Sequence, residues 1–204
     1  MPELFNRTTG SFEEALVISP IGQQDIDEYA AQWLPPMLQR VDELRQRGPL
    51  TRQMLAENNV EDAHWEWPEK WLARTALEWN SFALRCGGRT QGLMFVNLLP
   101  RARLPSQATQ HLAYIDLLST APWNRPRLAP TPTYRGVGAL LVTEAILLSK
   151  DEGFEGRIAL HSLPGAVDFY EHKCGMANLG ADPGYHDLPY FEMTPAQAAA
   201  FLET

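Results

Sequence analysis

The stretch Tyr134-Arg135-Gly136-Val137-Gly138-Ala139-Leu140-Leu141 decides how this chain folds. It joins a basic residue and two glycines to an apolar run that continues to Leu148. Leu141, Ala145 and Leu148 recur at the spacing of one helical face, and Gly153 can end the helix. We therefore predict a helix over 136–150 that begins directly at a glycine-rich turn.

This turn has the properties of an anion site. Glycine lets a ligand approach the backbone closely, and the N–H groups of a helix's first turn have no partner within the helix. The helix dipole favours negative charge there, and Arg135 adds a guanidinium whose geometry suits phosphate. We expect a phosphate-bearing ligand at this helix start, although two glycines in this position also occur as a plain turn and cap. The pattern lacks the Gly-Lys-Ser/Thr of a P-loop and the third small residue of the dinucleotide fingerprint.

The composition is that of an ordinary globular protein. A length of 204 residues makes one domain the default, and 45% hydrophobic with 21% charged residues is a usual balance. A net charge of -8 disfavours a nucleic-acid surface, and no apolar run is long enough to span a bilayer. Met1-Pro2-Glu3-Leu4 does not resemble a secretory signal, and Cys86 and Cys174 form neither a disulfide framework nor a metal motif. We expect a cytoplasmic protein without a metal, a membrane or a nucleic acid as partner.

The rest of the pattern predicts helices and strands in alternation. Residues 1–12 are expected to be a loose lead-in, and the tryptophans of 65–79 to pack together or line a substrate pocket. Pro35-Pro36 should break or kink the helix that Asp25 begins, and Thr51 should cap a short helix. Strands are predicted at 15–18, 81–86, 91–98, 110–119, 157–161 and 185–193, and short helices at 165–173 and 194–204. This order indicates an α/β (α+β) fold with a mixed sheet and a late strand–helix–strand crossover.

Two motifs on these elements resemble the signatures of the GNAT superfamily of N-acetyltransferases. The first signature, Arg/Gln-x-x-Gly-x-Gly/Ala, opens the central helix of that family. Arg135 and Gly138 match it, while Leu140 stands where Gly or Ala is usual.

The second signature is an Ala-x-x-x-Tyr-Glu helix that runs into Gly-Phe. Ala166, Tyr170 and Glu171 match, and Gly175-Met176 is a near match with one extra residue before it. Leu163 stands where the family often has an Asn that contacts the coenzyme.

The resemblance implies a mixed, mostly antiparallel central sheet flanked by helices, in a single domain over 1–204. Residues 80–193 would form the acetyl-CoA-binding core, 1–79 a variable strand and helices, and 194–204 a C-terminal helix. It further implies direct transfer of an acetyl group from acetyl-CoA to a primary amine of a small molecule, peptide or protein. The loop over 121–134 is longer than the family's usual link, so it would cover the cofactor, line the acceptor pocket or form a plain surface insertion.

The same resemblance places the co-substrate. Strand 113–120 would part from its neighbour and pair with the pantetheine arm, and the diphosphate would lie on the turn before the helix. The implied cofactor-binding residues are Leu118, Ser119, Thr120, Arg135, Gly136, Val137, Gly138, Ala139, Leu140 and Tyr170.

Three residues are the candidates for catalysis. Tyr170 lies where the family often places the acid for the departing sulfur, and its alternative role is packing. His161 is a candidate base because its ordinary pKa suits work near pH 7, although single histidines are often structural. Asp116 would act through a water or lie on the exposed face of its strand. Weaker candidates are His111 and Glu78 as bases and the Leu118 N–H as oxyanion donor, and Cys174 is expected to be a small buried residue.

Two other functions stay open at this point. One alternative is a catalytically silent acyl-CoA-binding sensor or interaction module of the same fold, which the departures at Leu140 and Leu163 support. The other alternative is an unrelated nucleotide binder that uses the glycine-rich turn. A homodimer is possible in either case.

Overall fold

A seven-stranded sheet runs through the computed structural model, which describes residues 1–203. Within these residues its strand order is β3-β4-β5-β6-β8-β10-β9. β8 runs parallel to β6, whereas the pairs β3–β4, β8–β10 and β9–β10 are antiparallel. The predicted mixed, mostly antiparallel sheet with flanking helices is confirmed. The strands are β3 (Leu16–Ile18), β4 (Trp79–Cys86), β5 (Arg89–Asn97), β6 (Ala113–Thr120), β8 (Ile158–His161), β9 (Ala177–Asp182) and β10 (Leu188–Met193).

The parallel strands β6 and β8 are joined by the predicted crossover. Helix α5 (Val137–Asp151) lies between β6 and β8 in the chain, as a parallel connection requires. The parallel register joins Ala113–Ile115 to Ile158–Leu160. The later residues of β6 therefore continue past this paired segment.

The chain packs into two compact units, each built from several segments. Unit 1 contains 1–76, 81–94 and 118–141, and unit 2 contains 77–80, 95–117 and the residues from 142 onward. The single domain over 1–204 stays a prediction, and Thr204, at the end of the helix predicted over 194–204, lies outside the described residues.

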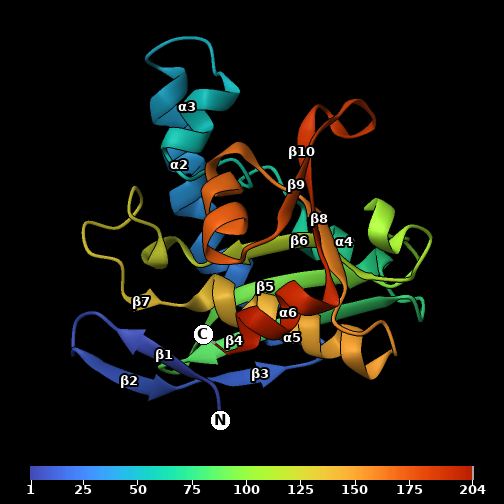
Figure 1. Cartoon of the computed structure of the whole chain (residues 1–204). Coiled ribbons are helices and arrows are strands. Elements are labelled where there is room, and N and C mark those ends of the chain that lie inside the picture. Colours follow the sequence, from blue (N-terminus) through green and yellow to red (C-terminus); the bar gives the residue numbers. More distant parts are fainter. Residues whose placement is uncertain (204) are drawn as a thin grey trace. The chain divides into compact units, whose positions relative to one another are not determined.

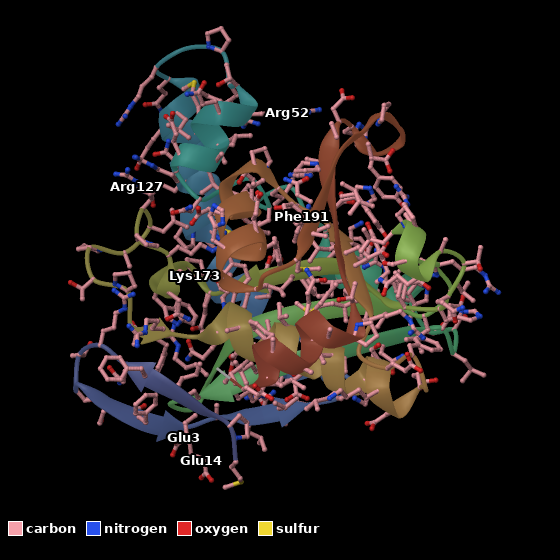
Figure 2. All side chains as sticks on the ribbon, viewed as in Figure 1. Glu3, Glu14, Arg52, Arg127, Lys173 and Phe191 are labelled. Carbon is pink, nitrogen blue, oxygen red and sulfur yellow. The ribbon has the colours of Figure 1, made fainter. Side chains whose placement is uncertain are left out.

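The first twelve residues are not a loose lead-in, so that prediction is wrong. In unit 1, β1 (Glu3–Asn6) pairs with β2 (Ser11–Glu14) and also with β7 (Tyr134–Arg135) in a separate three-stranded sheet (Figure 1). Glu3 and Glu14 are paired across β1 and β2 (Figure 2), and the rings of Phe5 and Phe12 meet edge to face at 5.3 Å. Two four-residue strands give little periodic signal, and the third strand lies far along the chain.

The helices of unit 1 confirm one local prediction and refine another. Pro35 and Pro36 do not break the helix: they lie in the first turn of α2 (Leu34–Arg45), where a missing N–H costs nothing. The irregularity is a π-helical turn directly before them, at Tyr29–Trp33. Thr51 caps the next helix by accepting a hydrogen bond from the Met54 N–H at 3.1 Å, as predicted. The helices are α1 (Gln23–Glu28), α2, α3 (Arg52–Glu57), which lies beside α2 in Figure 1, and α4 (Trp67–Ala73).

Unit 2 ends in the antiparallel strands β10 and β9 and the helix α6 (Pro195–Leu202) (Figure 1). β10 lies within the predicted 185–193. β9 comes before that range and was not predicted, because its mostly exposed residues show no alternation of buried and exposed positions. The short helix predicted over 165–173 is confirmed, and it begins as the 3₁₀ turn Pro164–Ala166 and ends as the π-helical turn Phe169–Lys173. Thr194 caps α6 in a capping box with Gln197, as predicted. None of the helices in residues 1–203 is long and apolar enough to cross a membrane.

Candidate functional site

The start of α5 presents an open backbone in unit 1. Arg135 and Gly136 are exposed, and Gly136 has a φ of 100°, a conformation that favours glycine. The N–H of Leu140 donates to the carbonyl of Gly136 at 2.9 Å. The N–H groups of Val137–Ala139 precede that bond, so they have no intrahelical acceptor. The anion site at this turn and its assignment to a diphosphate both stay predictions.

Gly92 of β5 brings the start of α5 close to the sheet. A Cβ built on Gly92 would lie 2.8 Å from side-chain carbons of both Val137 and Leu141, and 3.5 Å from the carbonyl oxygen of Ser119. Only a residue without a side chain fits between these groups. Gly92 therefore sets the packing of the glycine-rich turn against β5 and the end of β6.

Gly92→Ala is expected to lower the free energy of unfolding by about 1–3 kcal/mol, because the added methyl overlaps Val137 and Leu141. Urea denaturation with the wild type as reference measures this change. Gly88→Ala measures backbone strain separately, because Gly88 has a positive φ, which Gly92 does not, and no atom lies within 4 Å of its added Cβ. An unchanged or higher unfolding free energy for Gly92→Ala would show that this close packing is absent.

The end of β6 is fixed by a buried ionic network in unit 1. Ser119 donates from its hydroxyl to Asp62 at 2.5 Å, and Arg125 forms two bonds to the same carboxylate at 2.6 and 2.7 Å. Arg125 also donates to the backbone carbonyls of Thr120 and Asn59. The side chain of Ser119 is thus occupied, and its backbone groups are what remains for the predicted cofactor contact.

Burial and charge act in opposite directions on Asp62. Burial alone would raise the pKa of this carboxyl, but the charge of Arg125 and the hydrogen bonds from Arg125 and Ser119 lower it overall. Asp62 is therefore ionised in the folded protein. We call Asp62, Arg125 and Ser119 the Asp62 network.

The loop over 121–134 is tied to unit 1 at its beginning. Trp123 and Asn124 both donate to the side-chain oxygen of Gln91, at 2.7 and 2.9 Å, and the Arg89 guanidinium lies 3.7 Å above the Trp123 ring. Together with buried Arg125, these contacts make residues 123–125 part of the packed structure. All three interpretations of the loop over 121–134 stay predictions.

Tyr170 is buried in unit 2 between aromatic neighbours. Its ring centroid lies 5.1 Å from that of Phe169 and 6.0 Å from that of Phe191, which Figure 2 labels on β10. Burial raises the pKa of Tyr170 above its ordinary value, so the hydroxyl keeps its proton at neutral pH. A protonated phenol can donate to a leaving group, but the same environment suits packing, and its catalytic role stays a prediction.

His161 is held between two side chains of unit 2. Its Nδ1 lies 2.7 Å from the hydroxyl of Tyr114 on β6, and its Nε2 lies 2.9 Å from Oδ2 of Asp182 on β9. The ring stacks on Tyr185 with a centroid distance of 3.9 Å, and its side chain is only 3% exposed. Both nitrogens are engaged, so in this arrangement His161 exchanges protons by way of Tyr114 or Asp182.

The pKa values of His161 and Asp182 are shifted by burial and by their neighbours. Burial lowers the pKa of His161, although the hydrogen bond with Asp182 acts to raise it. The hydrogen bond from Arg103 and that from His161 lower the pKa of Asp182 to about 2. The pair is therefore a neutral imidazole beside an ionised carboxylate at neutral pH.

A cavity of about 350 Å³ opens beside these residues in unit 2. Asp116 lines it together with Tyr114 and His161, so the structure brings two of the three predicted catalytic residues to one cavity. Tyr114 and Asp116 are two positions apart on β6 and share a face of the strand. The lining residues are Trp79, Asn97, Pro100, Arg101, Arg103, Tyr114, Asp116, His161, Tyr185 and Tyr190.

His111 and Glu78 stay predictions as weaker candidate bases. His111 stacks on Phe154 at 5.3 Å, and the backbone carbonyl of Glu78 accepts the N–H of Leu98. Cys174 is buried as predicted, and burial raises the pKa of its thiol to about 12, so it is not an active nucleophile at neutral pH. Among residues 1–203, no three His, Cys, Asp or Glu side chains are grouped so that they would hold a metal ion.

Sequence reasoning missed the partners of His161 and of Arg125. Tyr114 carried a weak signal, since it precedes Asp116 by two positions in the same strand. Asp182 and Asp62 carried none, because they lie 21 and 63 positions from His161 and Arg125.

Comparison with known proteins addresses the fold. No protein-family model and no curated protein sequence matches the chain. A crystal structure described as a bacterial toxin aligns with 93% of this chain and 97% of its own, at 15% identity and a TM-score of 0.54. A structure from Corynebacterium glutamicum, described as histone acetyltransferase HPA2 and related acetyltransferase, aligns with 88% of this chain and 94% of its own, at 18% identity and a TM-score of 0.50. At such identities the likeness extends to the fold alone, and the chain has the fold of the GNAT superfamily of N-acetyltransferases.

Proposed function

We propose that the chain is an acetyl-CoA-dependent N-acetyltransferase, which moves an acetyl group directly to a primary amine of a small molecule, peptide or protein. The main support is the open start of α5, packed against β5 through Gly92 beside the Ser119 carbonyl of β6. This arrangement puts the proposed anion site beside the end of β6, which continues past the residues that pair with β8. The fold supports the proposal without specifying the acceptor.

The residues at the start of α5 fit a diphosphate. The N–H groups of Val137, Gly138 and Ala139 point along the helix dipole, and exposed Arg135 adds a cation. Backbone groups of Leu118, Ser119 and Thr120 would hold the pantetheine arm. Acetyl-CoA, when bound, would supply an activated thioester, and the protein's task is to orient it and to manage protons.

Tyr170 would give a proton to the sulfur as the carbon–sulfur bond breaks. Its raised pKa keeps the hydroxyl protonated before that step. The Leu118 N–H would donate to the carbonyl oxygen as negative charge develops there.

Tyr170→Phe is expected to lower kcat by roughly 10–100-fold while KM for acetyl-CoA changes little, because only the acid is removed. Steady-state kinetics with varied acetyl-CoA separates the two constants. A kcat within twofold of the wild type would assign Tyr170 to packing.

The activity itself is tested by thiol release from acetyl-CoA with a panel of spermidine, tyramine, kanamycin and a lysine-containing peptide. We expect amine-dependent release and an acetylated amine in the mass spectrum. Binding of acetyl-CoA by calorimetry without turnover on any of these amines would favour the silent acyl-CoA-binding module. A preference for ATP over coenzyme A in a thermal-shift assay would favour the nucleotide binder.

A further inference from the structure

Three side chains from three elements of unit 2 form a continuous hydrogen-bonded array. Tyr114 comes from β6, His161 from the end of β8 and Asp182 from the end of β9, with distances of 2.7 and 2.9 Å between successive members. We call this the Tyr114–His161–Asp182 array. Tyr114 and His161 line the cavity described above, whereas Asp182 is not among its lining residues.

The far end of the array fixes its proton positions. Asp182 accepts hydrogen bonds from Arg103 and from the Gly184 N–H, so its carboxylate is held in place and ionised. An ionised carboxylate can only accept, so the Nε2 of His161 must carry a hydrogen. In the neutral ring the Nδ1 is then an acceptor, and the Tyr114 hydroxyl must donate to it.

This order leaves the oxygen of Tyr114, a residue that lines the cavity, free to accept a further hydrogen bond. A phenol that donates its hydrogen to Nδ1 keeps its lone pairs for another donor. Asp116 lines the same cavity and supplies a carboxylate for an ammonium group. Leu118–Thr120, which the proposed function assigns to the thioester arm, follow Asp116 in the sequence of β6.

We propose that this cavity holds the acceptor amine and that Tyr114 is the catalytic residue that takes its proton, with His161 and Asp182 as positioning residues that relay it. The inference rests on the proposed acetyl transfer and deepens it. Asp116 orients the amine, and the aromatic rings of Trp79 and Tyr185 bound the cavity beside it.

The proposed step balances in atoms and charge. The bound ammonium group first gives one proton to water. The neutral amine nitrogen then forms a bond to the thioester carbon as the carbon–sulfur bond breaks, and its remaining N–H becomes strongly acidic as positive charge develops on nitrogen. That proton passes to the Tyr114 oxygen while the hydroxyl proton of Tyr114 passes to Nδ1 of His161. The resulting imidazolium pairs with the Asp182 carboxylate, and Tyr170 protonates the departing sulfur. Solvent then removes the proton from His161 and restores that of Tyr170.

The surrounding charges set the pH dependence of this step. Groups facing His161 from the packed elements and the cavity wall are Arg101, Arg103, Tyr114, Asp116, Asp182, Tyr185 and Tyr190. Relay requires a neutral His161, and burial keeps its pKa below the ordinary value of about 6.5. We therefore expect protonation of His161 to give kcat an acidic limb below that pH.

His161→Gln separates relay from structure. A glutamine side chain can donate to Asp182 and accept from Tyr114, so it preserves both hydrogen bonds, but it cannot take a proton. We expect His161→Gln and Tyr114→Phe to lower kcat about 30-fold on the best amine of the panel, and His161→Gln to lose the acidic limb of the kcat profile. The control Tyr29→Phe loses a comparable hydroxyl contact, to the Trp65 carbonyl in unit 1, and should retain the kcat of the wild type.

Two outcomes would overturn the relay. If the wild type acetylates an amine while Tyr114→Phe and His161→Gln keep kcat within threefold, the relay is wrong and the acetyltransferase proposal stands. Long-range ¹H–¹⁵N spectra of the protein without ligands should show His161 with hydrogen on Nε2, and the opposite tautomer would also overturn it. Absence of transfer to every amine would overturn the acetyltransferase proposal and, with it, this use of the array.

Discussion

Arg125→Ala is expected to lower the free energy of unfolding by about 3–5 kcal/mol. The substitution leaves the carboxylate of Asp62 buried, with the Ser119 hydroxyl as a remaining donor. Arg125 also supplies donors to the Thr120 and Asn59 carbonyls, so the end of β6 loses its link to the 121–134 loop. Urea denaturation at pH 7 measures the loss.

The pH dependence of this loss has a defined sign. In the wild type the pKa of Asp62 is lowered on folding, so its contribution is present above the unfolded pKa and disappears as pH falls through the folded pKa. Without Arg125, burial dominates and raises the pKa of Asp62 above its unfolded value. Protonation of Asp62 at low pH then removes the unpaired buried charge that destabilises the variant. The difference between the two proteins should therefore be largest near pH 7 and should shrink toward pH 4.

Arg127→Ala is the matched control for Arg125→Ala. Arg127 lies on the same loop but is exposed, as Figure 2 shows, so its removal should change the unfolding free energy by less than about 0.5 kcal/mol. Equal effects of the two substitutions, or a loss for Arg125→Ala that does not vary with pH, would show that the Asp62 network does not hold the loop.

Gly138→Glu is expected to weaken acetyl-CoA binding by about a thousandfold. The added carboxylate lies in the first turn of α5 and would repel a diphosphate there, a like-charge contact that costs several kcal/mol. A carboxylate in the first turn of a helix is otherwise favourable, so the variant should fold. Titration calorimetry with acetyl-CoA measures the change.

Ala200→Glu provides the charge control for this binding prediction. Ala200 is exposed on α6, so the same change in net charge is made away from the glycine-rich turn. We expect its affinity for acetyl-CoA to equal that of the wild type. If the Gly138→Glu protein binds acetyl-CoA as tightly as the Ala200→Glu protein, the diphosphate does not bind at the start of α5.

Local signals made parts of this fold predictable. The Thr51 and Thr194 caps, the Gly87-Gly88 hairpin turn and the helix after Gly136 depend on residues adjacent in the chain. Their hydrogen bonds are set by local backbone geometry, so residue type and spacing were enough.

Long-range pairing explains what the sequence did not reveal. β1 and β2 take part in a sheet whose third strand is β7, and no periodic pattern in the sequence predicts the pairing of β1 with β7. Sequence placed Asp116 and His161 among the candidates, but their shared cavity depends on the register of β6 with β8 and of β8 with β10. Tyr114 and Asp182 became visible only once that register was known.

A crystal structure of the protein with coenzyme A tests the central claim most directly. We expect the diphosphate oxygens to lie about 2.7–3.2 Å from the backbone nitrogens of Val137, Gly138 and Ala139. A diphosphate bound elsewhere, with these N–H groups covered by protein side chains, would contradict the proposed cofactor site.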